Sequence, residues 1–241
     1  TSPTTLGLLG ISLLLFIVFI VLQRKLKSPL LPLSIFKVPN LSVGNIVMAL
    51  MAGAWIPLWF YLNLYLQQTL GYSAFYSGLA LLPMTITIMV LMVGLTGKLI
   101  AKFGYKLTLI TGLVALTASL IWFSFVPVLG NFLTHVLGAS LLGAIGMSLA
   151  YIPGTMAAMS GAKPEEAGLA SGLVSTTYQV GSAIGLAIAV AIAIATTNGF
   201  ASGASASTEA LNAGFQSAFR AAAVISGLGV VIAFLGIKQF K

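Results

Sequence analysis

The ten residues GKLIAKFGYK, 97 to 106, separate two apolar stretches that are each long enough to cross a lipid bilayer. They contain three lysines, two glycines and no acidic residue. A short charged segment between two long apolar runs is typical of a turn between membrane helices, with the lysines on the cytoplasmic side. The stretch therefore predicts a hairpin of two transmembrane helices.

The composition of the whole chain agrees with a membrane protein. Of 241 residues, 59% are hydrophobic and 6% are charged, and the mean hydropathy is +1.10. A soluble domain has about a quarter of its residues charged, so this chain cannot cover a soluble globule. The net charge of +8 does not indicate nucleic acid, because the lysines lie at the ends of apolar runs and form no basic face. The absence of cysteine excludes disulfides and thiolate metal sites.

Seven apolar stretches are long enough to span the bilayer, which requires about 20 residues. They are continuously apolar, unlike the alternating strands of a transmembrane barrel. The sequence therefore predicts an all-α polytopic membrane protein with seven transmembrane helices. The predicted spans are Leu6 to Leu22, Leu41 to Leu66, Tyr76 to Leu99, Leu107 to Val126, Phe132 to Pro153, Gly168 to Ala195 and Phe215 to Ile237.

Basic residues predict the orientation of these spans. Alternate connections carry ten of the eleven basic residues, and the other connections carry none. By the positive-inside rule the basic connections are cytoplasmic, so the N-terminus is expected outside and the C-terminus inside a plasma membrane, with the bacterial inner membrane favoured. The ten residues are Arg24, Lys25, Lys27, Lys37, Lys98, Lys102, Lys106, Lys163, Lys238 and Lys241.

A short internal similarity indicates a repeat. The third span begins with SGLA, 77 to 80, outside the membrane, and the sixth begins with AGLA, 167 to 170, inside it. Two inverted three-helix units would give this relationship, as in many secondary transporters. Residues 41 to 241 are then one six-helix bundle, and residues 1 to 40 are a linker helix followed by a segment that lies along the cytoplasmic interface.

GKLIAKFGYK resembles the characteristic cytoplasmic loop of the major facilitator superfamily, G-x-L-x-D-(R/K)-x-G-x-(R/K). Gly97, Leu99, Lys102, Gly104 and Lys106 match this pattern. Ala101 stands where the family has aspartate, as is common in the second copy of the loop. The resemblance implies that these five residues form a loop with a conformational role.

Three other stretches resemble the fourteen-helix drug:proton antiporters of that superfamily. They are SPLLPLSIF (28 to 36), LQQTLGYSAFYSGLALLP (66 to 83) and AGLASGLVSTTYQVGSAIGLAIA (167 to 189). The resemblance implies that the first helix is the second of two inserted between the family's bundles. It also implies that residues 41 to 241 are the C-terminal bundle, whose partner is a missing N-terminal six-helix bundle.

One face of the second span carries the candidate substrate-binding residues. Amides, indoles and a methionine recur at helical spacing, which suits either a cavity for flat, hydrophobic or cationic molecules or contacts between helices. The resemblance implies that this helix and the fifth span line a central cavity. For Tyr151 an anchoring position at the membrane interface is the alternative. The candidates are Asn45, Met48, Trp55, Trp59, Asn63 and Gln67 on the second span, and Met147 and Tyr151 on the fifth.

The sixth span has a stripe of small and polar residues, which lets helices approach closely. We expect it to form a helix-packing interface. Its members are Gly168, Gly172, Ser175, Gln179, Gly181 and Gly185.

Acidic residues are nearly absent from the chain. It has no aspartate, and Glu165, Glu166 and Glu209 lie in connections or at helix ends. A carboxylate for proton coupling is therefore expected in the missing half. Arg220, inside the last span, is expected to reach water near the outer end, and the single histidine, His135, to serve as a hydrogen-bonding group.

These features predict the C-terminal half of a secondary active transporter that exports hydrophobic or cationic compounds by proton-coupled alternating access. They do not indicate an enzyme, a metal site, a cofactor or nucleic-acid binding. The expected partners are the lipid bilayer, the missing bundle and a small hydrophobic or cationic substrate. The alternative is a non-transporting seven-helix receptor or accessory subunit.

Overall fold

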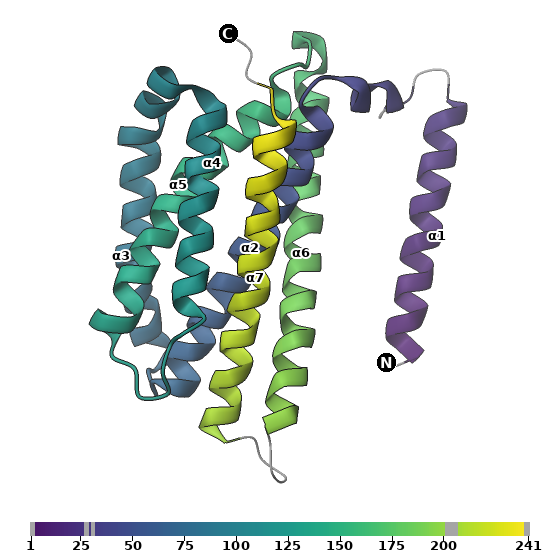
Figure 1. Cartoon of the computed structure of the whole chain (residues 1–241). Coiled ribbons are helices and arrows are strands. Elements are labelled where there is room, and N and C mark those ends of the chain that lie inside the picture. Colours follow the sequence, from purple (N-terminus) through teal and green to yellow (C-terminus); the bar gives the residue numbers. More distant parts are fainter. Residues whose placement is uncertain (1–2, 27–28, 30–31, 201–206, 239–241) are drawn as a thin grey trace.

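The computed structural model describes residues 3–26, 29, 32–200 and 207–238, and every regular element within these ranges is helical (Figure 1). Two of the basic residues used to predict orientation, Lys27 and Lys241, lie outside the described residues, as do Ser28, Leu30 and Leu31 of the SPLLPLSIF stretch. The prediction of an all-α polytopic membrane protein is confirmed.

Seven long helices form the structure. They are α1 (Pro3–Lys25), α2 (Leu41–Leu64), α3 (Ala74–Leu91), α4 (Gly97–Phe123), α5 (Gly138–Met159), α6 (Ala167–Phe200) and α7 (Thr208–Gly236). Short helical segments extend or join them: η1 (Leu33–Lys37), η2 (Tyr65–Thr69), η3 (Met92–Thr96), η4 (Phe132–Leu137) and η5 (Pro164–Glu166). Of these, η2, η3 and η4 are π-helical.

By length and apolarity, 6 continuous helical stretches of the described residues could cross a membrane, and one of them contains two of the predicted spans. This stretch, Ala74–Phe123, has 50 residues. A straight helix of that length would measure about 75 Å, far beyond a bilayer core of about 30 Å. Gly104 interrupts it with φ 80° and ψ 164°, and the chain reverses there (Figure 1). The chain therefore makes seven helical passes.

Several helices extend beyond their predicted ends, α5 and α7 among them. Helix α5 continues through Pro153 to Met159, because the surrounding helices hold its backbone where the proline removes one hydrogen bond. Helix α7 begins at Thr208 rather than Phe215, and the Ser207 hydroxyl caps it by accepting a hydrogen bond from the Ala210 N–H at 3.2 Å. The first turns of α7 contain polar residues, so the apolar run alone does not reveal where this helix begins.

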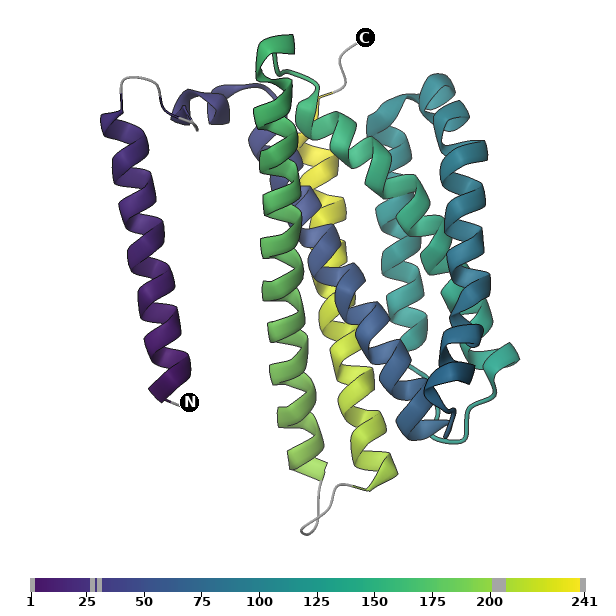
Figure 2. The same ribbon diagram turned by 180° about the vertical axis from the view of Figure 1, so that it is seen from behind.

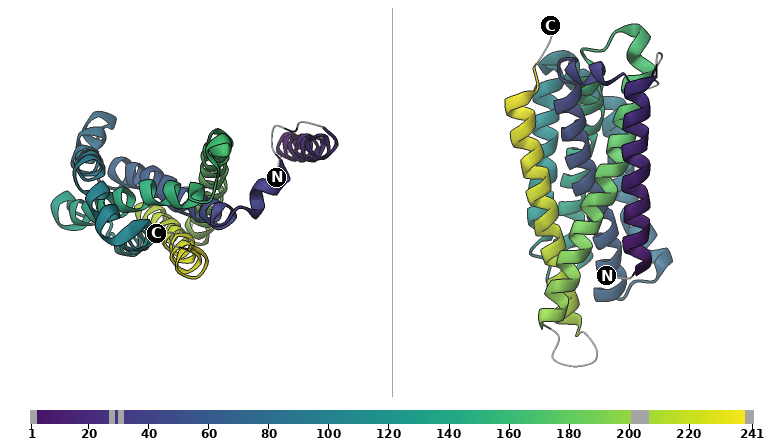
Figure 3. Two further views of the ribbon diagram at one scale, coloured as in Figure 1. Left: turned by 90° about the horizontal axis from the view of Figure 1, so that it is seen from above. Right: turned by 90° about the vertical axis from the view of Figure 1, so that its right-hand side faces the viewer.

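Helices α2 and α5 occupy the middle of the bundle. Helix α2 packs chiefly on α6 and α7, whereas α5 packs chiefly on α4 and α3. Figure 1 shows α2 crossing behind α7, Figure 2 shows the same crossing from the other side, and Figure 3 shows the bundle from above, with α1 apart from it. Each central helix therefore makes its main contacts with helices that lie in the other half of the bundle sequence.

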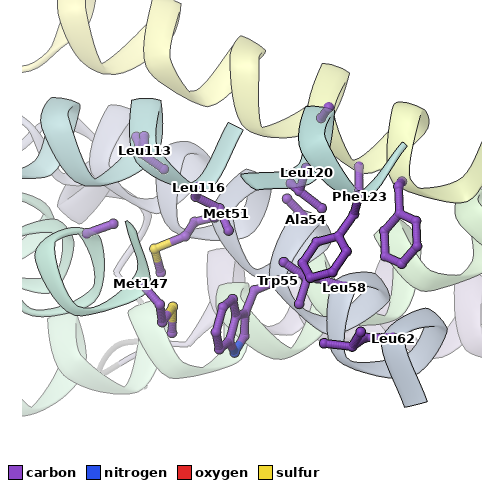
Figure 4. Packing of buried hydrophobic residues seen from close by; sticks show 14 of the residues in the cluster. Met51, Ala54, Trp55, Leu58, Leu62, Leu113, Leu116, Leu120, Phe123 and Met147 are labelled. Atoms are coloured by element: carbon purple, nitrogen blue, oxygen red, sulfur yellow. The ribbon is translucent and has the colours of Figure 1, made fainter. Parts of the chain in front are cut away.

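The hydrophobic core lies between α2, α4, α5 and α7. Figure 4 shows Met51 and Leu58 of α2 meeting Leu116, Leu120 and Phe123 of α4, with Trp55 and Met147 at the edge of this cluster. The ring of Phe123 stacks on that of Phe219 in α7, with centroids 5.2 Å apart. Leucine and phenylalanine side chains thus fill the core between these helices, and Trp55 and Met147 lie at its edge.

Helix α1 stands apart from the bundle, beside α6 (Figures 1 and 3). Every residue of α1 is exposed except Ile20, which is half-buried, and Gln23, which is buried. The segment η1 connects this side to α2, and its Ile35 is buried against Leu41 and Ala170. That this segment lies along the cytoplasmic interface stays a prediction.

Candidate functional site

Side chains from four helical passes line one open hollow of about 420 Å³ on the bundle surface, and its aromatic members come from α2, α5 and α6. Helix α2 contributes Trp55 and Trp59, whose rings meet edge to face with centroids 6.0 Å apart. The other lining residues are Ile88 and Met92 on the third pass, Met147 and Tyr151 on α5, and Tyr178 on α6. We refer to Trp55, Trp59, Met147, Tyr151 and Tyr178 as the aromatic wall.

A second hollow of about 370 Å³ adjoins the first. The two share Tyr151 and Tyr178, whose rings meet edge to face with centroids 5.7 Å apart. The second hollow is more polar, since hydroxyl and amide groups of α5 and α6 line it. Its other lining residues are Met48, Thr155, Ser171, Val174, Ser175 and Gln179.

This arrangement suits flat apolar or cationic molecules. Indole and phenol faces stack on aromatic rings and attract cations, and methionine adapts its shape to different ligands. The three acidic residues of the chain are absent from both linings. Attraction of a cation by this surface would therefore depend on ring faces and hydroxyl oxygens.

The structure brings five of the eight candidate substrate residues to these hollows: Met48, Trp55, Trp59, Met147 and Tyr151. Asn45 is buried, and its Nδ2 donates to the Leu41 carbonyl at 2.8 Å, while its Oδ1 has no protein partner. Farther along α2, Gln67 Nε2 donates to Asn63 Oδ1 at 2.6 Å. Asn63 and Gln67 thus pair with each other near the C-terminal end of α2, away from the two linings.

The six candidate packing residues on α6 occupy three different positions. Gly181 and Gly185 lie against α2, where an added Cβ would come closer than 3.0 Å to backbone atoms of Ala49 and Gly53. Ser175 and Gln179 line the second hollow. Gly168 and Gly172 have no neighbouring atom within 4 Å of an added Cβ, and they face the space toward α1.

The loop residues Gly97, Leu99, Lys102, Gly104 and Lys106 surround the reversal at Gly104, inside α4. Gly104 has the positive φ that only glycine adopts without strain. The ammonium groups of Lys102 and Lys106 lie 5.1 and 5.8 Å from the ring centroids of Phe103 and Phe234. Leu99 lines a small hollow beside Phe103, and the Cβ of a residue at Gly97 would meet open space.

A cluster of hydrogen bonds joins this loop to three other helix ends. Asn40 Nδ2 donates to Ser160 Oγ at 3.0 Å and to the Lys238 carbonyl at 2.6 Å, and its Oδ1 accepts from the Lys238 N–H at 2.8 Å. Tyr105 donates its hydroxyl to the same Lys238 carbonyl at 2.7 Å. We call Asn40, Tyr105, Ser160 and Lys238 the polar clasp, because they tie α2, α4, α5 and α7 together at one end.

The remaining polar residues singled out in the sequence are His135 and Arg220. His135 Nδ1 accepts a hydrogen bond from the Asn131 N–H at 3.1 Å at the start of η4. Arg220 is exposed on α7. Among the described residues, no group of three or more His, Cys, Asp or Glu side chains is placed to hold a metal ion.

Sequence reasoning missed Tyr178, Met92 and Ile88 in the first hollow and Ser171 in the second. A signal existed for two of them, since Ser171, Val174, Ser175 and Tyr178 follow the i, i+3, i+4, i+7 pattern of one helix face. The prediction followed the glycines, which lie on the adjacent face of the same helix. No comparable periodic signal marks Ile88 and Met92 in the uniformly apolar third pass.

Comparison with known proteins gives a family match over most of the chain. Residues 3–186 match the family model of the Major Facilitator Superfamily. The chain is 34% identical over 179 residues, 74% of its length, to a tetracenomycin C resistance and export protein of Streptomyces glaucescens. It is 32% identical over 172 residues, 71% of its length, to a cephamycin export protein of Amycolatopsis lactamdurans.

A third relative is a quinolone resistance protein of Staphylococcus aureus, 29% identical over 189 residues, which are 76% of this chain. The matched regions make up 33%, 35% and 39% of the Streptomyces, Amycolatopsis and Staphylococcus proteins. The chain therefore spans little more than a third of the length of these relatives.

Proposed function

Because this chain belongs to the major facilitator superfamily, we propose that it is the C-terminal half of a proton-coupled exporter of hydrophobic or cationic compounds. Its relatives include proteins named for the export of cephamycin and tetracenomycin C. The chain matches only about a third of their length, which supports a missing partner half. These relationships favour a transporter over a seven-helix receptor.

The aromatic wall is the observation that carries the proposal. It concentrates two indoles, two phenols and a thioether around one open hollow at the surface of the bundle. Transporter substrates bind near the bilayer midplane, between two related bundles. In this proposal the hollow is one side of that site, and the missing N-terminal bundle supplies the other.

Alternating access fits the arrangement of the helices. Helices α2 to α7 pack together, with α2 on α6 and α7 and with α5 on α4 and α3. This exchange of contacts is expected of two inverted three-helix units. One unit is α2 to α4, and the other is α5 to α7. We assign α3 and α6, the least buried helices of the bundle, to the surface that rocks against the other half.

Proton coupling is assigned to the missing half. Protonation and release within the membrane require an ionisable group in the pathway. The three glutamates of this chain lie at helix ends, outside both linings of the site. The proposal therefore places substrate contacts on this half and the proton-carrying carboxylate on the other, within a bacterial plasma membrane.

The test replaces the indoles in the full-length transporter. Inverted vesicles carrying Trp55→Ala or Trp59→Ala are assayed for proton-driven uptake of a fluorescent planar cation. Loss of one aromatic contact should raise the apparent KM about tenfold. The matched control is Phe60→Ala, an exposed aromatic residue on the same helix, which should leave the KM unchanged.

Two results would contradict the proposal. Equal KM values for both tryptophan variants and the control would remove the aromatic wall from the substrate site. Uptake that persists after a protonophore collapses the proton gradient would exclude proton coupling while leaving transport itself intact.

A further inference from the structure

Residues of α1, α6 and η1 line a separate apolar cavity of about 690 Å³. Its volume falls within the roughly 300–1,000 Å³ typical of small-molecule sites. Figure 2 shows α1 beside α6, on the side of α6 away from the rest of the bundle. Aromatic and aliphatic side chains of α1 form one wall: Phe16, Phe19 and Ile20. The opposite wall on α6 includes Gly168, Gly172, Thr176 and Val180, and Phe36 of η1 also contributes to the lining.

The small residues of α6 create this space. An added Cβ at Gly168 or Gly172 would meet nothing within 4 Å, in contrast to Gly181 and Gly185, which α2 fills. Thr176, a hydroxyl-bearing residue in the lining, already donates to the Gly172 carbonyl at 2.9 Å. The lining therefore offers no unpaired hydroxyl at this position and presents an apolar surface to an occupant.

The surroundings of the cavity favour an apolar occupant. Both flanking helices are long and apolar enough to span the membrane, with mean hydropathies of 2.9 for α1 and 2.1 for α6 over their most apolar windows. Water would find few polar partners in this space, so an apolar molecule is favoured over water there. A hydrocarbon chain matches the lining and reaches it from the surrounding bilayer.

Basic residues border the cytoplasmic end of the cavity. Arg24 follows Ile20 by one helical turn on the same face of α1, and Lys25 is next to it. Lys37 follows the lining residue Phe36. Glu165 and Glu166 precede α6, and Glu166 Oε2 accepts from the Lys163 N–H at 3.5 Å. With Lys163, four basic residues oppose two acidic ones in the segments that border the cavity.

We propose that this cavity binds one anionic phospholipid of the cytoplasmic leaflet. An acyl chain lies between Phe16, Phe19 and the glycines of α6, and the phosphate lies at Arg24 and Lys25. Basic pockets between membrane helices on the cytoplasmic side bind anionic headgroups in this way. The lipid would fix α1 beside the bundle, since α1 has few protein contacts of its own.

Photo-labelling of the full-length transporter in nanodiscs tests the proposal. The probes are phosphatidylglycerol and phosphatidylcholine that carry the same diazirine-bearing acyl chain, and labelled peptides are identified by mass spectrometry. Phosphatidylglycerol should label the peptides around Phe16–Ile20 and around Gly168–Val180. Gly172→Leu fills the cavity and should abolish this labelling, whereas Gly10→Leu, an equally open glycine on α1 outside the lining, should preserve it.

The headgroup is tested by charge removal. Arg24→Gln should reduce phosphatidylglycerol labelling about fivefold without affecting phosphatidylcholine, because one basic residue near the surface contributes about that factor. Lys98→Gln, an exposed base on another cytoplasmic turn, is the control. Equal labelling by both wild-type probes would overturn the anionic specificity. Labelling elsewhere but not in the cavity would mean that another part of the transporter fills it, and would overturn the proposal.

Discussion

Asn40 holds together the end of the bundle at which the polar clasp lies. It is the only non-glycine residue with a positive φ, 64°, among those that the structure describes, and its amide makes four of the five hydrogen bonds within the polar clasp. Asparagine tolerates this backbone conformation better than most residues. Asn40 thus accepts the positive φ at this position, and its side chain joins α2 to α5 and α7.

Replacing Asn40 should therefore destabilise the fold. Asn40→Ala removes the hydrogen bonds and leaves a strained backbone, at a cost of roughly 2–4 kcal/mol. Asn40→Gly removes only the bonds and should cost less. The measurement is the thermal unfolding temperature of the full-length protein in detergent, with the exposed Asn198→Ala as control. An Asn40→Ala protein that unfolds at the wild-type temperature would show that the clasp contributes no stability.

The candidate site was predictable only where side-chain type and helical spacing agreed. Trp55, Trp59 and Met48 share a face of α2, and that face does reach the two hollows. The same spacing also predicted Asn63 and Gln67, which bond to each other instead. Periodicity gives the angle of a side chain around its helix, whereas the neighbouring helices decide at which height that angle opens to a cavity.

At the scale of elements, the crossing of α2 and α6 depends on the absence of side chains. The backbone of Gly185 lies against that of Gly53, and Gly181 lies against Ala49. Small residues at such positions let two membrane helices approach closely and gain van der Waals contact. Because Tyr178 and Gln179 stand on the same helix, this crossing also positions the α6 side of both hollows.

Gly185→Ala should separate these helices. The added methyl group would lie closer than 3.0 Å to the backbone of Gly53, and relief of that overlap should cost about 1–3 kcal/mol. Gly172→Ala adds the same group to open space on the same helix and should have little effect. Thermal unfolding of the two variants side by side is the measurement, and coinciding transitions would show that the crossing tolerates a side chain.

The third pass contains a segment, η3, that the local sequence does not predict. The π-helical segment η3 carries Met92 to the first hollow and leaves an irregular backbone. Thr96 restores the hydrogen bonding, since its hydroxyl lies 3.0 Å from the Leu91 carbonyl and 3.1 Å from the Ser148 carbonyl of α5. Such π segments are frequent at functional sites, and hydropathy cannot distinguish them from regular helix.

For the whole molecule, the untested prediction is its orientation in the membrane. The absence of cysteine from this chain allows single-cysteine labelling in a full-length protein made free of other cysteines. Leu129→Cys, at a position 94% exposed in the connection after α4, should react with a membrane-impermeant maleimide added outside intact cells. Ala101→Cys, in the GKLIAKFGYK turn, should react only after the membrane is opened. The reverse pattern would invert the proposed topology.

The sequence by itself determined the class of the protein and the number of its membrane passes. Long apolar runs admit only helices in a bilayer, because each backbone group must find its partner within its own segment. GKLIAKFGYK also predicted the turn between two helices, which the structure places at Gly104. Few residues other than glycine accept the positive φ found there. The spacing of tryptophan and methionine on α2 indicated a functional face.

Only the tertiary structure decided which residues meet. Sequence placed Gly168, Gly172, Gly181 and Gly185 in one packing stripe, yet two of them contact α2 and two face a cavity beside α1. Tyr151 and Tyr178 form one edge-to-face pair although 27 positions separate them in the chain, as their numbers show. The physical reason is that apolar helices have no strong rotational preference in lipid, so close packing between particular neighbours selects the faces that touch.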